Sequence, residues 1–392
     1  MEYQYARRIL QTKASEIREL LKLTENPEVI SFAGGLPAPE LFPIPEIKAA
    51  HDYVLNNHGE QALQYAATEG YQPLRKWIAA RMNMQLGTSF CDDNIMITHG
   101  SQQALDLSGK VFLDEGDVVI CESPTYLAAI SAFKAYGCRF VEIETDAEGM
   151  VLSSLEKALQ TYPMVKLIYI IPNFQNPTGR TWSFERRRQL AQISAQYNAV
   201  VIEDNPYGEI RFEGTFQPSV KSFDSKGNII CVGTFSKIFC PGYRIGWIAG
   251  EKDLIRKFAL VKQGADLQCN TIAQMVIATY LEQYDIDAHI VKIRDVYRKR
   301  RDAAMEAIYK YFPSDIACTK PEGGLFLWIE LNEKIDTGKL LEQCLACNVA
   351  FVPGRSFYPN KEKRNTLRIN FSTTQEERIN DGISRIGRLL MD

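Results

Sequence analysis

Residues 167–204 read LIYIIPNFQNPTGRTWSFERRRQLAQISAQYNAVVIED. Leu167–Ile171 and Val200–Glu203 are short runs of almost entirely apolar residues, and Ser183–Tyr197 between them has the pattern of a helix. Short apolar runs of this kind are typical of strands that are covered on both faces, as in a mainly parallel sheet. The stretch therefore predicts a strand, a loop rich in Asn and Pro, a helix and a second strand.

The same alternation of apolar runs and helical patterns extends over the middle of the chain. Five more runs predict strands, at Asn94–Thr98, Val118–Cys121, Arg139–Glu144, Ile229–Gly233 and Arg244–Ala249. Three further helices are expected between them, over Ser101–Leu113, Tyr126–Tyr136 and Ser153–Thr161. The sequence therefore predicts an α/β protein whose large domain contains a mainly parallel seven-stranded sheet.

The regions on either side of this alternation predict an N-terminal arm and a second, smaller domain. A long charged helix is expected over Asp285–Tyr311, and the tail after it predicts an α+β domain with strands at Leu325–Leu331, Ala350–Val352 and Thr366–Ser372 and helices at Thr337–Cys347 and Thr374–Leu390. The arm contains one expected helix, Ser15–Leu23. We therefore expect an arm over residues 1–45 that packs with the small domain, a large domain over 46–285 and a small domain over 286–392.

The composition excludes several classes of protein. The 392 residues include 45 Lys and Arg against 48 Asp and Glu, so the net charge of −3 argues against a nucleic-acid partner. The basic runs Arg186–Arg188 and Arg298–Arg301 are interpreted as solvated helix faces. No apolar run is long enough to span a membrane and no signal core is evident. Nine cysteines and four histidines without framework or metal-ligand spacing predict a cytoplasmic protein with no metal site.

Chemically useful side chains follow the predicted strands of the large domain, where open α/β sheets bind their ligands. Ser101 and Gln102 open a helix after the first strand, so their backbone N–H groups predict a phosphate site. Tyr126 follows the next strand and can place its ring over a planar ligand. Asn176 lies after Leu167–Ile171, and the remaining residues of this kind are Asp204, Tyr207, Ser236, Lys237 and Arg244.

Taken together, these segments resemble the fold-type-I pyridoxal-phosphate (PLP) enzymes, in particular the class I and II aminotransferases. The resemblance covers essentially the whole chain and is closest to the branch that contains 2-aminoadipate, kynurenine and aromatic aminotransferases. Its clearest matches are SFAGGLP at residues 31–37, ALQY at 62–65, GSQQALD at 100–106, KQGAD at 262–266 and AFVPG at 350–354.

The resemblance implies a role for each residue around the cofactor ring. Lys237 falls where the family's lysine binds PLP covalently and then moves the proton of the substrate. Asp204 matches the carboxylate that faces the pyridine nitrogen, and Tyr126 matches the ring stacked on the pyridine face. Tyr207, with Asn176 as its partner, matches the tyrosine that hydrogen-bonds the phenolic oxygen of the cofactor.

The resemblance also implies how the phosphate and the substrate are bound. Ser101, Gln102, Ser236 and Arg244 match the phosphate ligands of the family, with the planar fork of Arg244 pairing two phosphate oxygens. Tyr65 matches a tyrosine that reaches the phosphate of the neighbouring subunit, which implies a homodimer with composite sites.

Three further residues are expected to bind the substrate, together with Asn176. Arg368 matches the arginine that binds the substrate α-carboxylate, and Gly35 lies in the loop that closes over the substrate. Arg18 belongs to the expected arm helix that covers the substrate. With Ser15 it is expected to face a distal carboxylate of the amino donor.

The expected function is a PLP-dependent aminotransferase that moves an amino group from an amino acid to 2-oxoglutarate by a ping-pong mechanism. The preferred donor is expected to be 2-aminoadipate, followed by aromatic amino acids. A PLP-dependent racemase, lyase or decarboxylase on the same fold is an alternative, although Arg368 argues against decarboxylation. A PLP-sensing transcription regulator is a second alternative from a different class, but fewer than fifty residues precede the expected large domain.

Overall fold

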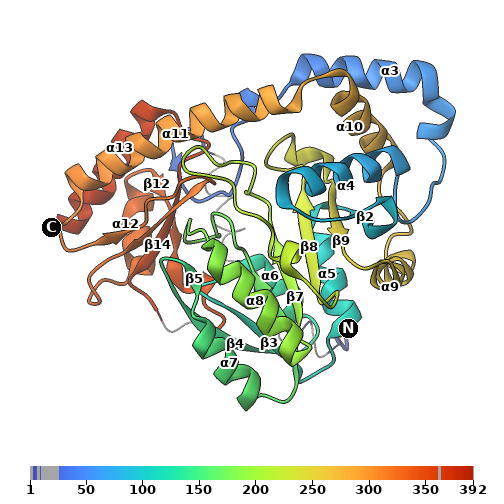
Figure 1. The fold of residues 1–392 in the computed structure, drawn as a ribbon. Helices are drawn as coiled ribbons and strands as arrows, with labels where there is room; N and C mark the ends of the chain where they lie inside the picture. Colours follow the sequence, from blue (N-terminus) through green and yellow to red (C-terminus); the bar gives the residue numbers. More distant parts are fainter. Residues whose placement is uncertain (1–2, 7–8, 10–25, 361–362, 392) are drawn as a thin grey trace.

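The computed structural model describes residues 3–6, 9, 26–360 and 363–391. Its largest sheet has the strand order β2-β9-β8-β7-β6-β3-β4-β5 (Figure 1). The strands are β2 (Ile95–Thr98), β3 (Val118–Ser123), β4 (Arg139–Asp146), β5 (Gly149–Met150), β6 (Val165–Ile170), β7 (Val200–Asp204), β8 (Ile229–Thr234) and β9 (Gly246–Ala249). β4, β3, β6, β7 and β8 pair in parallel, whereas β9 is antiparallel to both of its neighbours.

Helices cover both faces of this sheet, as the apolar runs predict. In β6, Leu167 and Tyr169 belong to one apolar cluster and Ile168 and Ile170 to another. The first cluster includes residues of α5 (Gly100–Phe112) and α6 (Leu127–Lys134), and the second includes residues of α7 (Leu152–Thr161) and α8 (Phe184–Tyr197). Successive residues of a strand point to opposite faces, so a strand buried on both faces is apolar throughout.

The large sheet contains all seven predicted strands and one addition, the two-residue strand β5, which forms a hairpin with β4. The predicted strand Arg244–Ala249 begins two residues later, because Arg244 has φ 54° and ends a short helical turn. Four helices of this region were not predicted as separate elements: α3 (Ile44–Ala62), α4 (Gln72–Leu86), α9 (Lys252–Gln263) and α10 (Thr271–Gln283).

A second, antiparallel sheet lies beside the large one, in the order β10-β11-β14-β13. Its strands are β10 (Ala317–Cys318), β11 (Phe326–Glu330), β13 (Val352–Pro353) and β14 (Thr366–Asn370). The long helix α11 (Ile286–Tyr311) reaches this sheet from the large one and packs on α13 (Glu376–Met391), while α12 (Thr337–Ala346) precedes β12 (Val349–Ala350). The segment before the large sheet joins this part of the fold, since β1 (Ile30–Ser31) pairs with β12. The division into domains at residues 45 and 285 stays a prediction.

The two basic runs are not fully solvated faces, and the interpretation from sequence was wrong for three of their arginines. Arg187, Arg300 and Arg301 are buried. Arg187 donates to the backbone oxygens of Trp182, Pro172 and Pro218. Helical periodicity alone cannot identify such residues, because the acceptors come from distant loops. Separately, no helix in the described part of the chain is long and apolar enough to cross a membrane.

Candidate active site

A cavity of about 350 Å³ opens at the carboxyl ends of the parallel strands, next to the small sheet. Its lining includes eleven of the thirteen residues predicted from sequence: Gly35, Ser101, Gln102, Tyr126, Asn176, Asp204, Tyr207, Ser236, Lys237, Arg244 and Arg368. The strands end at different points of the chain but at the same edge of the sheet. Residues up to 333 positions apart in sequence therefore meet in one cavity.

Lys237 lies three residues beyond the end of β8, and its amine points into the cavity. Its Nζ donates to the backbone oxygen of Gly35 at 2.7 Å. Loss of solvent around the amine, together with the positive charges of Arg244 and Arg368, lowers the pKa of Lys237 to about 8. Roughly a tenth of such an amine is neutral and nucleophilic at pH 7, far more than for a lysine with its ordinary pKa.

Asp204 is the last residue of β7 and is 1% exposed. Tyr169, on the neighbouring strand β6, donates its hydroxyl to Oδ2 at 2.8 Å. Among the described residues, no group bonds to the other oxygen, Oδ1. Burial raises the pKa of Asp204 to about 7, although the Tyr169 hydrogen bond acts in the opposite direction. A buried carboxylate oxygen without a partner is costly, so this atom fits a donor or cation brought by a ligand.

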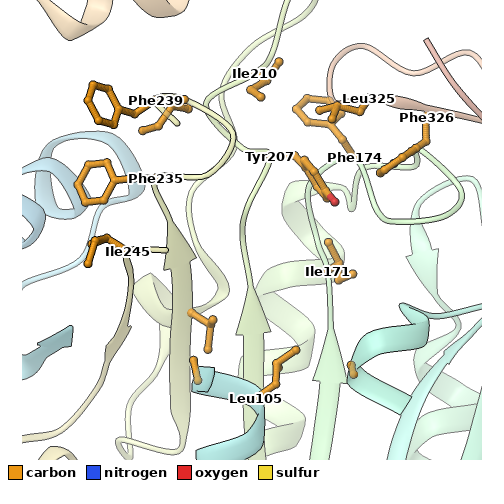
Figure 2. Packing of buried hydrophobic residues seen from close by; sticks show 14 of the residues in the cluster. Leu105, Ile171, Phe174, Tyr207, Ile210, Phe235, Phe239, Ile245, Leu325 and Phe326 are labelled. Carbon is orange, nitrogen blue, oxygen red and sulfur yellow. The ribbon is translucent and has the colours of Figure 1, made fainter. Parts of the chain in front are cut away.

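Two tyrosines flank the space above Asp204. Burial raises the pKa of both Tyr126 and Tyr207, that of Tyr126 to about 12, so both remain neutral donors at ordinary pH. Tyr207 packs edge-on against Phe326 of the small sheet at a ring-centroid distance of 5.8 Å. Figure 2 shows Tyr207 beside Phe174 and Phe326, with Ile171 nearer to the sheet. These contacts hold the hydroxyl of Tyr207 at the cavity.

The end of the cavity at the N-terminus of α5 is suited to a phosphate. Ser101 and Gln102 form the first turn of α5, where backbone N–H groups lack acceptors within the helix. Gly100 has φ +71°, and a Cβ there would lie 2.7 Å from Nη2 of Arg244, so only glycine allows this approach. Ser236 is fixed because its N–H donates to Oγ1 of Thr234 at 3.1 Å. The guanidinium of Arg244 is exposed and its Nη1 donates to the backbone oxygen of Pro241 at 3.2 Å.

Arg368 lies on β14 and is 2% exposed, between the rings of Phe326 and Phe357. Its Nη1 donates to Oδ1 of Asn176 at 2.8 Å and its Nη2 to the backbone oxygen of Ala33 at 2.5 Å. Burial lowers the pKa of Arg368 to about 10, so the guanidinium remains charged at neutral pH. No carboxylate of the described residues pairs with it, and a buried cation in this position is a natural site for an anion.

The other two predicted residues are Tyr65 and Arg18. Tyr65 is 80% exposed and does not contact the cavity of its own chain. Arg18 lies outside the described residues.

Sequence reasoning also missed residues that bond to a site residue or to the helix α5 that begins at the cavity. Tyr169 was assigned only to a strand, because nothing in the sequence marks its hydroxyl as the partner of Asp204. Lys262, 0% exposed, bonds to Asp266 at 2.6 Å and to Gln103 on α5 at 3.1 Å. Asp266 also lies 3.3 Å from His99, the residue that precedes α5. His99, Asp266 and Cys269 could surround an ion, but the ammonium of Lys262 already bonds to Asp266 there.

The geometry fits PLP on two independent observations. The unpartnered Oδ1 of Asp204 and the amine of Lys237 face the same cavity. PLP would need both groups there, because its ring has a pyridine nitrogen and a carbonyl group. The N-terminus of α5 and Arg244 supply donors and positive charge for a phosphate at the same cavity.

Comparisons with known proteins show which family the chain is similar to. The family model for aminotransferase class I and II matches residues 28–386. The aromatic-amino-acid aminotransferase 1 of Thermococcus litoralis is 46% identical over 100% of this chain and 95% of its own length. The 2-aminoadipate transaminase of Thermus thermophilus is 40% identical over 96% of this chain and 94% of its own. The solved kynurenine aminotransferase of Pyrococcus horikoshii, in complex with PMP, has a TM-score of 0.95 at 42% identity, over 99% of this chain and 96% of that one.

Proposed function

The chain belongs to the class I and II aminotransferases, and we propose that it moves an amino group from a long or aromatic amino acid to 2-oxoglutarate in a ping-pong cycle. It is a PLP-dependent enzyme. When bound, PLP supplies an electron sink that stabilises negative charge at the substrate Cα. The observation that most strongly supports the proposal is the presence, in one cavity, of the Lys237 amine and the unpartnered Oδ1 of Asp204.

Lys237 is assigned two tasks, which are to bind the cofactor covalently and to move the proton of the substrate. Its lowered pKa supports both tasks, because only the neutral amine can attack a carbonyl carbon or accept a proton. The single hydrogen bond to Gly35 is the only one recorded for Nζ among the described residues, so little has to be broken when the amine moves.

Asp204 is assigned the task of keeping the ring nitrogen protonated. A carboxylate whose pKa is raised by burial regains its charge when a cation lies beside it. Tyr169 fixes the orientation of the carboxylate through Oδ2, which leaves Oδ1 free to face the ring. Tyr207 and Asn176 would donate to the oxygen on the ring, and Tyr126 would cover its face.

The phosphate would be held by the N–H groups of Ser101 and Gln102, by Ser236 and by Arg244. This end of the cavity offers the donors and the positive charge that a dianion needs. Fixing the phosphate at one end and the ring nitrogen at the other places the reacting carbon near Lys237, which is how positioning lowers the entropic barrier.

Arg368 and Asn176 would bind the substrate carboxylate. Amino donor and oxo-acid acceptor both have a carboxylate next to the reacting carbon, so one arginine serves both halves of a ping-pong cycle. Arg368 now bonds to uncharged oxygens of Ala33 and Asn176, and its Nε has no partner among the described residues. A carboxylate offers this buried cation a stronger partner. Retention of the carboxylate also favours transamination over decarboxylation.

We propose 2-aminoadipate as the first donor and aromatic amino acids as the next. The names of the relatives from Thermus thermophilus and Thermococcus litoralis support both classes. Leu36 and Leu127 line the cavity and provide apolar surface for a long side chain. Arg18 is assigned to the distal carboxylate of aminoadipate.

We further propose a homodimer in which Tyr65 of one subunit completes the phosphate site of the other. Tyr65 and its neighbour Leu63 are 80% and 73% exposed, so both side chains are available to a partner subunit. All nine cysteines are free, which supports a reducing compartment, and we place the enzyme in the cytosol.

A panel of amino acids tested against 2-oxoglutarate, with glutamate formation as the readout, examines the proposed reaction. We expect the highest kcat/KM for 2-aminoadipate, then for aromatic amino acids. Two half-reactions measured separately should each proceed without the other substrate, as ping-pong requires. Failure of every donor with 2-oxoglutarate, but turnover with another oxo acid, would refute the proposed acceptor.

A further inference from the structure

The loop between β6 and α8 brings Asn176 to the substrate side of the cavity. Oδ1 of Asn176 accepts one of the two recorded hydrogen bonds of the Arg368 guanidinium, at 2.8 Å. At its base the loop closes on itself, because the N–H of Trp182 donates to the oxygen of Pro172 at 2.9 Å. The position of the loop therefore contributes to the orientation of the Arg368 guanidinium, together with its bond to the backbone oxygen of Ala33.

One buried carboxylate joins the two ends of this loop. Glu122, on β3, is 2% exposed. Its Oε2 accepts from the N–H of Ile171 at 3.0 Å, and its Oε1 accepts from the indole Nε1 of Trp182 at 2.9 Å. Ile171 precedes the loop and Trp182 follows it, so the carboxylate bonds to both ends, and Arg187 adds bonds to the backbone oxygens of Pro172 and Trp182. Burial raises the pKa of Glu122 to about 7, although its hydrogen bonds act in the opposite direction. A polar group buried in this way is costly unless it is bonded.

The middle of the loop is bonded to the segment that follows β3, the strand of Glu122. Nε2 of Gln175 donates to the oxygen of Pro124 at 2.7 Å, and Oε1 of Gln175 accepts from the Thr178 hydroxyl at 2.6 Å. Phe174, also on the loop, is buried beside Leu325 and Phe326 of the small-sheet region (Figure 2). The loop thus spans from the large sheet to the small one, and a shift at its base moves Asn176 relative to Arg368.

From these contacts we propose that Glu122 is a positioning residue for substrate-carboxylate binding, which fixes the base of the loop over residues 172–181 so that Asn176 orients Arg368. Glu122 does not line the cavity, so it acts only through the loop. The inference rests on the proposed function, since it assigns the substrate carboxylate to Arg368.

The variant Glu122→Gln tests this role. An amide has one acceptor oxygen, so either the Ile171 N–H or the Trp182 indole faces an NH₂ group and loses its bond. We expect KM to rise about tenfold for the amino donor and for the oxo acid alike, because both need the Arg368 fork, with a smaller change in kcat. Trp182→Phe, which removes only the indole donor, should raise both KM values by a smaller factor.

A matched control is Glu203→Gln on the neighbouring strand β7. Glu203 is 1% exposed and accepts from the N–H of Val220 at 3.0 Å and from the Ser219 hydroxyl at 2.5 Å, away from the loop. This variant should lower the melting temperature as Glu122→Gln does, but leave both KM values unchanged. Equal KM effects in the two variants, or none in either, would overturn the positioning role.

Hydrogen exchange in the cofactor-free protein gives a readout that does not depend on activity. Glu122→Gln should speed exchange at the Ile171 amide and in peptides of the loop, whereas Glu203→Gln should not. Unchanged exchange in the loop overturns the inference even if the enzyme is a transaminase. Lack of transamination by the wild-type protein refutes the proposed function instead. If Glu122→Gln does not fold, Trp182→Phe provides the same comparison against Glu203→Gln.

Discussion

Replacing Asp204 by Asn keeps the shape of the side chain but removes its charge, and we expect this change to slow proton transfer at the substrate Cα by about a thousandfold. The estimate follows from the surroundings of the carboxylate, which is 1% exposed and has one oxygen without a partner. Two opposite charges about 4 Å apart interact by roughly 4 kcal/mol at an effective dielectric constant of about 20. Each 1.36 kcal/mol, roughly, is a factor of ten in rate.

The assay is a single-turnover half-reaction. Cofactor-loaded enzyme is mixed with an amino donor in the absence of oxo acid, and the loss of visible absorbance gives the rate of the chemical step. Tyr169→Phe is the matched control, because it removes one hydrogen bond to Asp204 but retains the charge. A hydrogen bond to a charged group is worth about 1.5–3 kcal/mol, so a loss of roughly ten- to a hundredfold is expected, smaller than that of Asp204→Asn. An Asp204→Asn enzyme that binds PLP and reacts within tenfold of wild type would refute the reasoning.

Three other predictions concern pH, the donor and the dimer. The pKa of Lys237 in the folded protein lies near 8, below its ordinary value of 10.5. The folded protein therefore binds fewer protons than the unfolded chain between these values, so in the cofactor-free protein the stability from this group rises with pH across that window. The melting temperature of wild type should therefore rise relative to that of Lys237→Met as the pH increases from about 8 to 10.5. Parallel pH profiles of the two melting temperatures would contradict the lowered pKa. Arg18→Ala should lower kcat/KM for 2-aminoadipate about ten- to a hundredfold and leave leucine and phenylalanine almost unchanged, whereas an equal loss for all donors would mean that Arg18 has a structural role. Tyr65→Phe should weaken cofactor binding, and hybrids with Lys237→Ala subunits should regain wild-type affinity at the sites that keep Lys237; hybrids that bind no better than Tyr65→Phe would contradict a composite site.

Much of the fold was predictable because strands covered on both faces are apolar throughout, as Leu167–Ile171 illustrates. The site residues of the large sheet were predictable for a related reason, since they end or follow strands whose carboxyl ends meet at one edge of the sheet. Lys237 and Asp204 thus reach one cavity although they are far apart in sequence. Arg368, which lies within β14 of the small sheet, was predicted only from the family resemblance.

Other features depend on contacts between distant segments, which local patterns do not encode. Arg187 lies in a run of three arginines, yet it is 0% exposed because it bonds to loop oxygens at Pro172 and Pro218. Glu122 likewise has the sequence context of an ordinary strand end, and only the packed sheet shows that it joins Ile171 to Trp182. Strand β5 has only two residues, too few for a periodic pattern.

The most direct test of the central claim is to locate the cofactor on the chain. The purified, PLP-loaded protein is reduced with borohydride and digested, and the modified peptide is identified by mass spectrometry. We expect the label on Lys237 alone, and no label and no transamination in Lys237→Ala. A label on any other lysine, or wild-type turnover by Lys237→Ala, would contradict the assignment of this cavity as the active site.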